Sequence, residues 1–149
     1  NELPNPDGIG RRSEFLGGNI YWTPNTGAHY VAHDFLTKWG EYGYETGFLS
    51  YPTTDEIVNP DGIGRRQEFQ GGTIYWAPLA GAHPIYGRIK EQWGTLGYEG
   101  GKLGYPLTDE VPSSGSWAAI SQRQQFFVGG GLFYDGPTDT VIVANRFRS

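Results

Sequence analysis

The chain carries the stretch NPDGIGRR twice, at residues 5–12 and again at residues 59–66. Downstream of each copy the same short motifs follow in the same order: EF, GG, IYW, GAH, WG, YP and TDE. Dispersed motifs that recur at one fixed spacing indicate a structural repeat, in which each copy is one supersecondary unit that packs on its neighbours. We therefore divide the chain into two complete repeats, 5–58 and 59–112, and a degenerate third repeat, 113–149.

The third repeat is shorter than the other two. Residues 125–134, QFFVGGGLFY, follow the pattern of EFQGGTIYW at residues 68–76, but the helical pattern and the TDE motif are missing after them. A chain of 149 residues buries roughly two thirds of its unfolded surface and needs no covalent staple. We expect a single domain spanning residues 1–149.

Each complete repeat is predicted to contain a turn, a hairpin and a helix. The NPDG stretch places Pro and Gly at the second and fourth positions of a type I turn. The β-favouring runs on either side of the GG pair predict a hairpin that turns at these glycines. Apolar residues then recur at helical spacing, with Gly43 and Gly97 placed where a helix would end. The recurring residues are Val31, Phe35, Trp39 and Tyr42 in repeat 1, and Ile85, Ile89, Trp93 and Leu96 in repeat 2.

These elements predict an α+β fold. We expect a repeat protein with a β-hairpin plus helix per repeat, in which two complete repeats and a shortened third form a pseudo-threefold compact domain around an aromatic core. A linear stack is the alternative, and it would need capped ends.

Composition excludes several classes of function. The formal net charge is −5 and the two arginine pairs are isolated, whereas a nucleic-acid partner requires clustered Lys and Arg. No apolar run approaches the roughly 20 residues of a membrane span. The absence of Cys excludes a disulfide scaffold and thiolate metal sites. His29 and His33 have zinc-ligand spacing, but Gly87 replaces His33 in repeat 2, so we expect no metal site and no cofactor.

The repetition itself argues against an enzyme. A catalytic site needs one constellation of unlike groups, whereas here the candidate carboxylates and histidines, His33 aside, occur twice with their surroundings. Neither a nucleophile elbow nor a phosphate loop occurs in the sequence. Two equivalent weak sites suit a binder instead, because they act together through effective concentration.

Carbohydrate binding needs a flat apolar ring together with fixed donors and acceptors. Ten residues meet this requirement: Tyr21, Trp22, His29, Asp55 and Arg12 in repeat 1, and Tyr75, Trp76, His83, Asp109 and Arg66 in repeat 2. Alternation along a strand should turn Trp22 and Trp76 toward the core with Ile20 and Ile74, and should turn Tyr21 and Tyr75 outward. For each aromatic residue, packing in the core is the competing interpretation.

The polar candidates have structural interpretations of their own. His29 and His83 follow Gly-Ala at the expected helix entrance, where an imidazole can bond to backbone. Asp55 and Asp109 follow Thr, where a carboxylate caps local amides. Arg12 and Arg66 lie two residues from Glu14 and Glu68 on the expected strand, which favours an ion pair over a sugar platform.

The segments GFLSYPTTDE and GKLGYPLTDE, at residues 47–56 and 101–110, resemble the LGFP repeat family, named for a Leu-Gly-Phe-Pro motif. The GG-x-IYW, TGAH or AGAH and KW or QW stretches are similar to that family as well, and the resemblance covers residues 1–112 and, weakly, the third repeat. Tyr replaces the motif's Phe in both repeats, and Ser50 replaces its Gly in the first. The resemblance implies an extracytoplasmic module of actinobacterial cell envelopes, found alone or appended to wall enzymes, that attaches to wall glycans.

We therefore predict a multivalent, lectin-like carbohydrate-binding or cell-wall-glycan-binding module. The alternative is a structural or protein-interaction spacer of the envelope that binds no sugar, and an enzyme ranks third. Because Asn1 follows no initiator Met or leader, we expect a secreted or wall-associated protein whose export signal has been removed, a piece of a larger wall enzyme being the alternative. The sequence specifies neither the sugar nor the oligomeric state.

Overall fold

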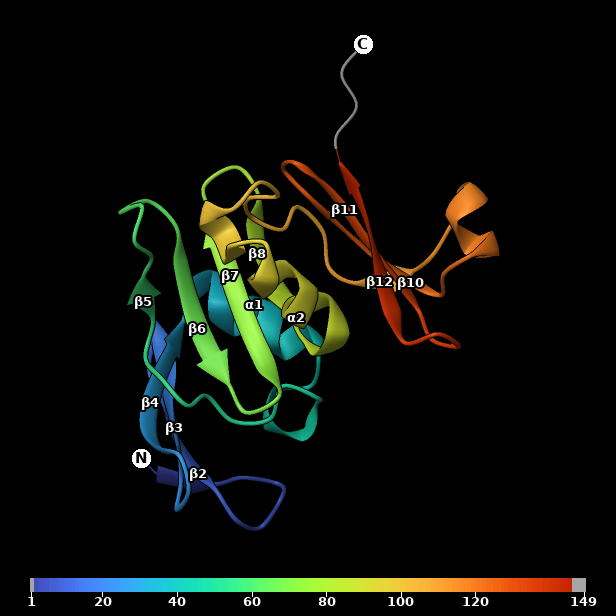
Figure 1. Ribbon diagram of the computed structural model, residues 1–149. Coiled ribbons are helices and arrows are strands. Elements are labelled where there is room, and N and C mark those ends of the chain that lie inside the picture. The colour runs from blue at the N-terminus through green and yellow to red at the C-terminus, as the bar shows by residue number, and fades with distance from the viewer. Residues whose placement is uncertain (1, 146–149) are drawn as a thin grey trace. The chain divides into compact units, whose positions relative to one another are not determined.

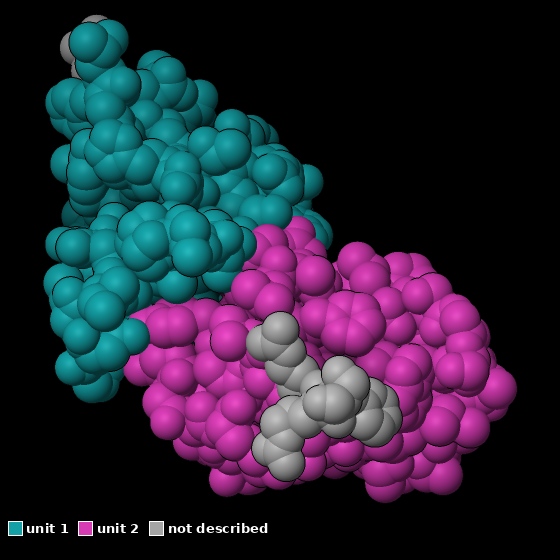
Figure 2. Space-filling model, turned by 90° about the horizontal axis from the view of Figure 1, so that it is seen from above, with its two compact units in different colours: residues 1–82 teal, residues 83–149 magenta. Residues whose placement is uncertain are grey.

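The computed structural model describes residues 2–145, which form three small antiparallel sheets and two α-helices (Figure 1). The chain divides into two compact units, unit 1 at residues 1–82 and unit 2 at residues 83–149 (Figure 2). The mixed α+β repeat architecture expected from the sequence is confirmed. The pseudo-threefold placement of the repeats and their assignment to one domain stay predictions. Neither described helix is long and apolar enough to cross a membrane.

The first sheet and the first helix belong to repeat 1. The strands are β1 (Glu2–Pro4), β2 (Arg11–Glu14), β3 (Gly18–Thr23) and β4 (Gly27–Ala32), and they pair in that order. Helix α1 (His33–Glu41) and the 3₁₀ turn η1 (Tyr44–Thr46) follow. Repeat 1 therefore contributes three consecutive antiparallel strands and a helix, and β1 adds a fourth strand at the edge of the sheet.

Repeat 2 has the same order of elements, and the third sheet has the same order of strands. The second sheet has the order β5 (Ile57–Val58), β6 (Arg65–Phe69), β7 (Gly72–Ala77) and β8 (Gly81–Ile85), and the boundary between the two units falls within β8. Helix α2 (Gly87–Thr95) and η2 (Tyr98–Gly100) come next. The third sheet contains β9 (Val111–Pro112), β10 (Arg123–Phe127), β11 (Gly130–Asp135) and β12 (Thr140–Asn145), and η3 (Gly115–Ala119) lies between β9 and β10.

The predicted turn is confirmed in both complete repeats. The amide of Gly8 donates to the carbonyl of Asn5 over 3.1 Å, and Gly8 has a φ of 74°, which glycine adopts at little cost. Asp7 Oδ1 accepts from the amides of Ile9 and Gly10, an arrangement that fixes the chain as it enters β2. Gly62, Asp61, Ile63 and Gly64 form the same bonds in repeat 2.

The expectation of only a hairpin and a helix per repeat is wrong at one element. The GAH motif lies on a third strand, with His29 opposite Tyr21 on β3, and so Val31 belongs to β4 and Ile85 to β8 instead of to the helices. Both residues are fully buried, so the apolar spacing was real. β4 leads directly into α1, and its buried residues continue the apolar spacing of the helix. Spacing alone therefore assigned the last residues of the strand to the helix. The expected helix end is confirmed, because Gly43, with a φ of 92°, follows the C-cap residue Tyr42.

Unit 1 is built around Trp39 of α1, which is completely buried between two sheets. Its ring lies 4.6 Å from that of Tyr21 on β3 and 5.4 Å from that of Phe69 on β6. Its indole N–H donates to the carbonyl of Ser50 over 3.0 Å. In unit 2, Trp93 donates to the carbonyl of Gly104 and stacks on Phe127 at 5.7 Å. Each helix therefore packs against a hairpin that belongs to the following repeat.

The Leu-x-Tyr-Pro segment completes this interlock through the backbone. The amides of Gln70 and Gly71, in the hairpin turn of repeat 2, donate to the carbonyls of Tyr51 and Leu49. A Cβ on Gly71 would lie 1.9 Å from the carbonyl oxygen of Phe48, so only glycine fits there. Val128 and Gly129 donate to Tyr105 and Leu103 in the same way. Consequently, the packing unit is one repeat's helix together with the next repeat's hairpin, out of phase with the sequence repeat.

The turn at residues 5–8 leads to a prediction about acid stability. Desolvation raises the pKa of Asp7, but hydrogen bonds from the Tyr51 hydroxyl and from the amides of Ile9 and Gly10 outweigh it and hold the pKa below its ordinary value of 3.8. A carboxyl group with a depressed native pKa stabilises the fold above its unfolded pKa, and this stabilisation is lost as the pH falls through the native pKa. We expect Asp7→Asn to flatten the decline in unfolding free energy below about pH 4, measured by urea titration at several pH values. An equally steep decline in the variant would contradict this prediction.

Candidate functional site

The structure reverses the predicted orientation of one pair of aromatic residues. Tyr21 and Tyr75, expected to face outward, are buried with 4% and 5% of their surface exposed. Trp22, expected to lean toward the core, is 39% exposed, whereas Trp76 is partly buried against the core of unit 1. Trp76 does share a face with the buried Ile74, as expected. The expectation that Tyr21 and Tyr75 face outward was wrong because both rings are buried, and β3 places Tyr21 against Trp39 of its own repeat.

The predicted histidines and aspartates are joined to each other. His29 lies on β4, with Nδ1 3.0 Å from Asp55 Oδ1 and Nε2 2.7 Å from the carbonyl oxygen of Thr26. In unit 2, His83 Nδ1 lies 2.6 Å from Asp109 Oδ1. The expected helix-entrance position is therefore wrong, and these pairs tie the GAH strand to the TDE segment.

Arg12 and Arg66 form the expected ion pairs and also hold the turns. Arg12 Nε lies 2.8 Å from Glu14 Oε2, and its Nη1 donates to Asn5 Oδ1 over 2.9 Å. Arg66 pairs with Glu68 at 3.4 Å and donates to Asn59 over 2.6 Å. Arg12 and Tyr21 also line a hollow of about 390 Å³ together with Tyr44 and Glu45. Arg12 and Trp22, two further predicted residues, line another hollow of unit 1.

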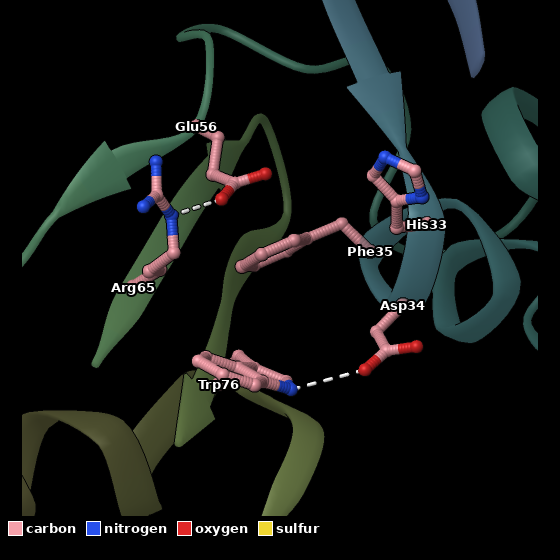
Figure 3. A pocket seen from close by; sticks show the side chains of 6 residues that line it. All are labelled: His33, Asp34, Phe35, Glu56, Arg65 and Trp76. Atoms are coloured by element: carbon pink, nitrogen blue, oxygen red, sulfur yellow. Dashed lines mark hydrogen bonds and ion pairs between the residues drawn. The ribbon is translucent and has the colours of Figure 1, made fainter. Parts of the chain in front are cut away.

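A second hollow in unit 1, the α1 groove, is lined by His33, Asp34, Phe35, Glu56, Arg65 and Trp76 and has a volume of about 190 Å³ (Figure 3). The start of α1 supplies three of these side chains, the TDE segment supplies Glu56, and the second hairpin supplies Arg65 and Trp76. The rings of Phe35 and Trp76 lie between an acid–base pair on one side and His33 with Asp34 on the other (Figure 3).

Polar contacts fix the walls of the α1 groove. Trp76 Nε1 donates to Asp34 Oδ2 over 3.0 Å, and Arg65 forms an ion pair with Glu56 (Figure 3). His33 has a φ of 53°, which is unusual for a residue other than glycine and lets the chain turn from β4 directly into α1. The groove is therefore preorganised: the Trp76 indole lies beside carboxylate and guanidinium groups that are held by contacts within the protein.

The acid, arginine and aromatic residue of the α1 groove recur in all three repeats. Arginine and the aromatic ring are directly opposite each other on the paired hairpin strands, and the acid comes from the strand or segment just before the hairpin. The three sets are Glu2, Arg11 and Trp22; Glu56, Arg65 and Trp76; and Glu110, Arg123 and Tyr134. We call these sets the Glu–Arg–aromatic clusters.

Sequence reasoning selected Arg12 and Arg66 and missed Arg11, Arg65 and the three glutamates. The missing signal was strand register: in a hairpin the residue opposite Trp22 is Arg11, and Arg12 points to the other face. The N-terminal NELP is similar to the DEVP of residues 109–112, and this similarity places Glu2 and Glu110 at equivalent positions. Within residues 2–145, no group of three or more His, Asp or Glu is arranged to hold a metal ion.

A family model described as "LGFP repeat" matches residues 1–47 and again residues 49–101. These two matches cover both helices and the first two sheets, which include the α1 groove. Among curated proteins, no significant match was found.

The two His–Asp pairs should differ in what they contribute to stability. The side chains of His83 and Asp109 are 15% and 17% exposed, whereas that of Asp55 is 69% exposed. Removal of a carboxylate that is paired and largely buried leaves its partner unsatisfied, so Asp109→Ala should lower the free energy of unfolding by about 1–3 kcal/mol. Asp55→Ala should cost less than about 1 kcal/mol, because solvent screens the exposed pair. Chemical denaturation of both variants tests this order, and an equal or larger cost for Asp55→Ala would refute it.

Proposed function

This chain belongs to the LGFP repeat family, and from that premise we propose that it is a multivalent, non-catalytic carbohydrate-binding module of lectin-like character whose ligands are neutral glycans, such as those of a cell wall. The observation that carries the proposal is the α1 groove, which sets the Trp76 indole beside the Glu56–Arg65 pair. An aromatic face suits the C–H face of a pyranose, and flanking carboxylate and guanidinium groups suit its hydroxyls.

The charges of the groove favour a neutral sugar. Two carboxylates, Asp34 and Glu56, face the single guanidinium of Arg65. A uronate or phosphate brought into this setting would meet like charge, which disfavours binding. The hollow around Arg12 has the same balance, because Glu14 and Glu45 line it together with one arginine. Acidic glycans should therefore bind more weakly than neutral glycans at either hollow.

The same contacts support a binding role over a catalytic one. A glycosidase needs one carboxyl group that gives a proton and a second carboxylate held at a set separation from it. Asp34 already accepts a hydrogen bond from Trp76, and Glu56 is paired with Arg65. In repeat 2 the residue that corresponds to Asp34 is Arg88, which bonds to Glu91 and Asp139. The feature that all three repeats share is therefore the Glu–Arg–aromatic cluster and not a pair of carboxylates.

Recurrence of the cluster accounts for the multivalent part of the proposal. Unit 2 holds the Glu110–Arg123 pair with Tyr134 opposite Arg123. Two modest sites on one chain bind a polymer more tightly than either alone, because the second contact forms at high effective concentration. A repetitive wall polysaccharide offers such paired epitopes, so we extend the proposal to a secreted or wall-associated location.

Isothermal titration with oligosaccharides tests the proposal. The probes are galactose, arabinose and rhamnose oligomers, with galacturonate oligomers as the anionic counterpart. We expect a neutral oligomer to bind and Trp76→Ala to weaken it by about tenfold or more, which corresponds to about 1.4 kcal/mol. Trp76→Phe, which keeps a ring, should retain most of the affinity, and this variant separates loss of the sugar contact from loss of packing.

The matched control is Tyr44→Ala, which removes an aromatic ring from the hollow around Arg12 and none from the lining of the α1 groove. Unchanged affinity in this control places the sugar in the α1 groove. Failure of every neutral oligomer to bind, or tighter binding of galacturonate, would refute the proposal.

A further inference from the structure

One face of the first sheet is exposed in the described part of unit 1, whereas its counterparts in repeats 2 and 3 are covered. This face, which we call the β2–β3 outer face, carries Phe15, Ser13, Ile20 and Trp22. The residues at the same positions in repeats 2 and 3 lie against the helix and the Leu-x-Tyr-Pro segment of the preceding repeat. Comparison of the three copies therefore shows what a covered face looks like and what covers it.

Exposure of the first phenylalanine shows the difference most clearly. Phe15 is 56% exposed, whereas Phe69 and Phe127 are 5% and 3% exposed. The latter two rings pack on Trp39 and Trp93 of the preceding helix. Ile20 is likewise partly exposed, while Ile74 and Leu132, its counterparts, are completely buried. Repeat 1 thus retains the apolar residues of the interface without a helix against them.

The hairpin turn retains the backbone features of the interface as well. A Cβ on Gly71 or Gly129 would collide with the carbonyl oxygen of Phe48 or Lys102 in the preceding repeat. At Gly17, the matching position, a Cβ would meet only the hydroxyl of Tyr30, at 3.4 Å. The sequence therefore keeps a glycine where this unit imposes no close approach. A carbonyl group of another segment, packed against residue 17 as it is against Gly71 and Gly129, would leave room only for glycine.

A shallow apolar groove of about 240 Å³ runs over the same face and is lined by Ile20, Trp22 and Ala28 with Glu2 and Arg11 at its polar side. In the α1 groove the equivalent space is closed by Asp34 and Phe35 of a helix. The first Glu–Arg–aromatic cluster is therefore the one that lacks a helical wall within the described part of unit 1.

We propose that the β2–β3 outer face is a docking surface for the helix and Leu-x-Tyr-Pro segment of another LGFP repeat. The docked helix places its tryptophan on Phe15, and the carbonyls of the Leu-x-Tyr-Pro segment accept from the amides of Leu16 and Gly17. These are the contacts that Phe69 and the amides of Gln70 and Gly71 make within unit 1. The proposal is independent of glycan binding, because it rests on packing alone.

An extended chain tests this docking directly. A further copy of residues 5–54 is placed directly before residue 1, so that corresponding residues of the added and the native repeat stay 54 positions apart. Asn1→Asp then completes a TDE motif at the junction, because Thr54 of the added copy precedes this position and Glu2 follows it. Hydrogen exchange of the Gly17 amide is then compared between the extended and the native chain. We expect exchange to slow by at least about tenfold in the extended chain, since a docked carbonyl protects the amide. Unchanged exchange would overturn the proposal.

Gly17→Ala supplies the control within the same pair of chains. In the native chain the added methyl group has room, so the unfolding midpoint should stay unchanged. In the extended chain the same methyl group meets the docked carbonyl and should lower the midpoint and restore fast exchange at Leu16. An equal effect of Gly17→Ala in both chains would overturn the proposal, as would protection of Gly17 by a neutral oligosaccharide but not by the added repeat.

Discussion

The buried indole of the helical tryptophan is the contact on which each unit of this protein depends. Trp39 bonds to the carbonyl of Ser50 in its own repeat and packs on Phe69 of the next repeat, and Trp93, Gly104 and Phe127 repeat the arrangement. A single side chain thereby fixes the helix, the Leu-x-Tyr-Pro segment and the following hairpin. Because one of its ring partners lies in the next copy, a repeat of this kind completes its core only with the hairpin that follows, and the packing unit spans two sequence repeats.

The sequence revealed the repeats, the turn at NPDG, the hairpins and the helix ends, because each depends on local residue types such as Pro, Asp and Gly. It did not reveal the third strand of each repeat. The GAH segment continues the apolar face of the helix that follows, and spacing alone does not separate the two. The orientation of Tyr21 and Tyr75 was also predicted wrongly. Alternation along a strand tells which residues share a face, but not which face of the hairpin packs against a helix.

Of the predicted site residues, Trp76 lies in the α1 groove, whereas the His–Asp pairs and Arg12 with Arg66 make contacts within the fold, and their part in ligand binding stays a prediction. Their repetition was read as a sign of ligand binding, but a structural contact repeats just as faithfully as a binding contact. Arg65 and Glu56 escaped notice because their association depends on cross-strand register and on a segment outside the hairpin. The α1 groove lies where α1 meets the hairpin of repeat 2, so the interlock that forms the core also builds the groove.

A double-mutant cycle on Trp39 and Phe69 tests the central claim that the cores form between successive repeats. Trp39→Phe and Phe69→Leu are measured singly and together by chemical denaturation, and the cycle is repeated with Trp39→Phe and Phe15→Leu. Residues in contact couple, whereas distant residues add. The account predicts a coupling energy of about 0.5–1.5 kcal/mol between positions 39 and 69 and additivity between positions 39 and 15. Additivity between positions 39 and 69 would contradict it.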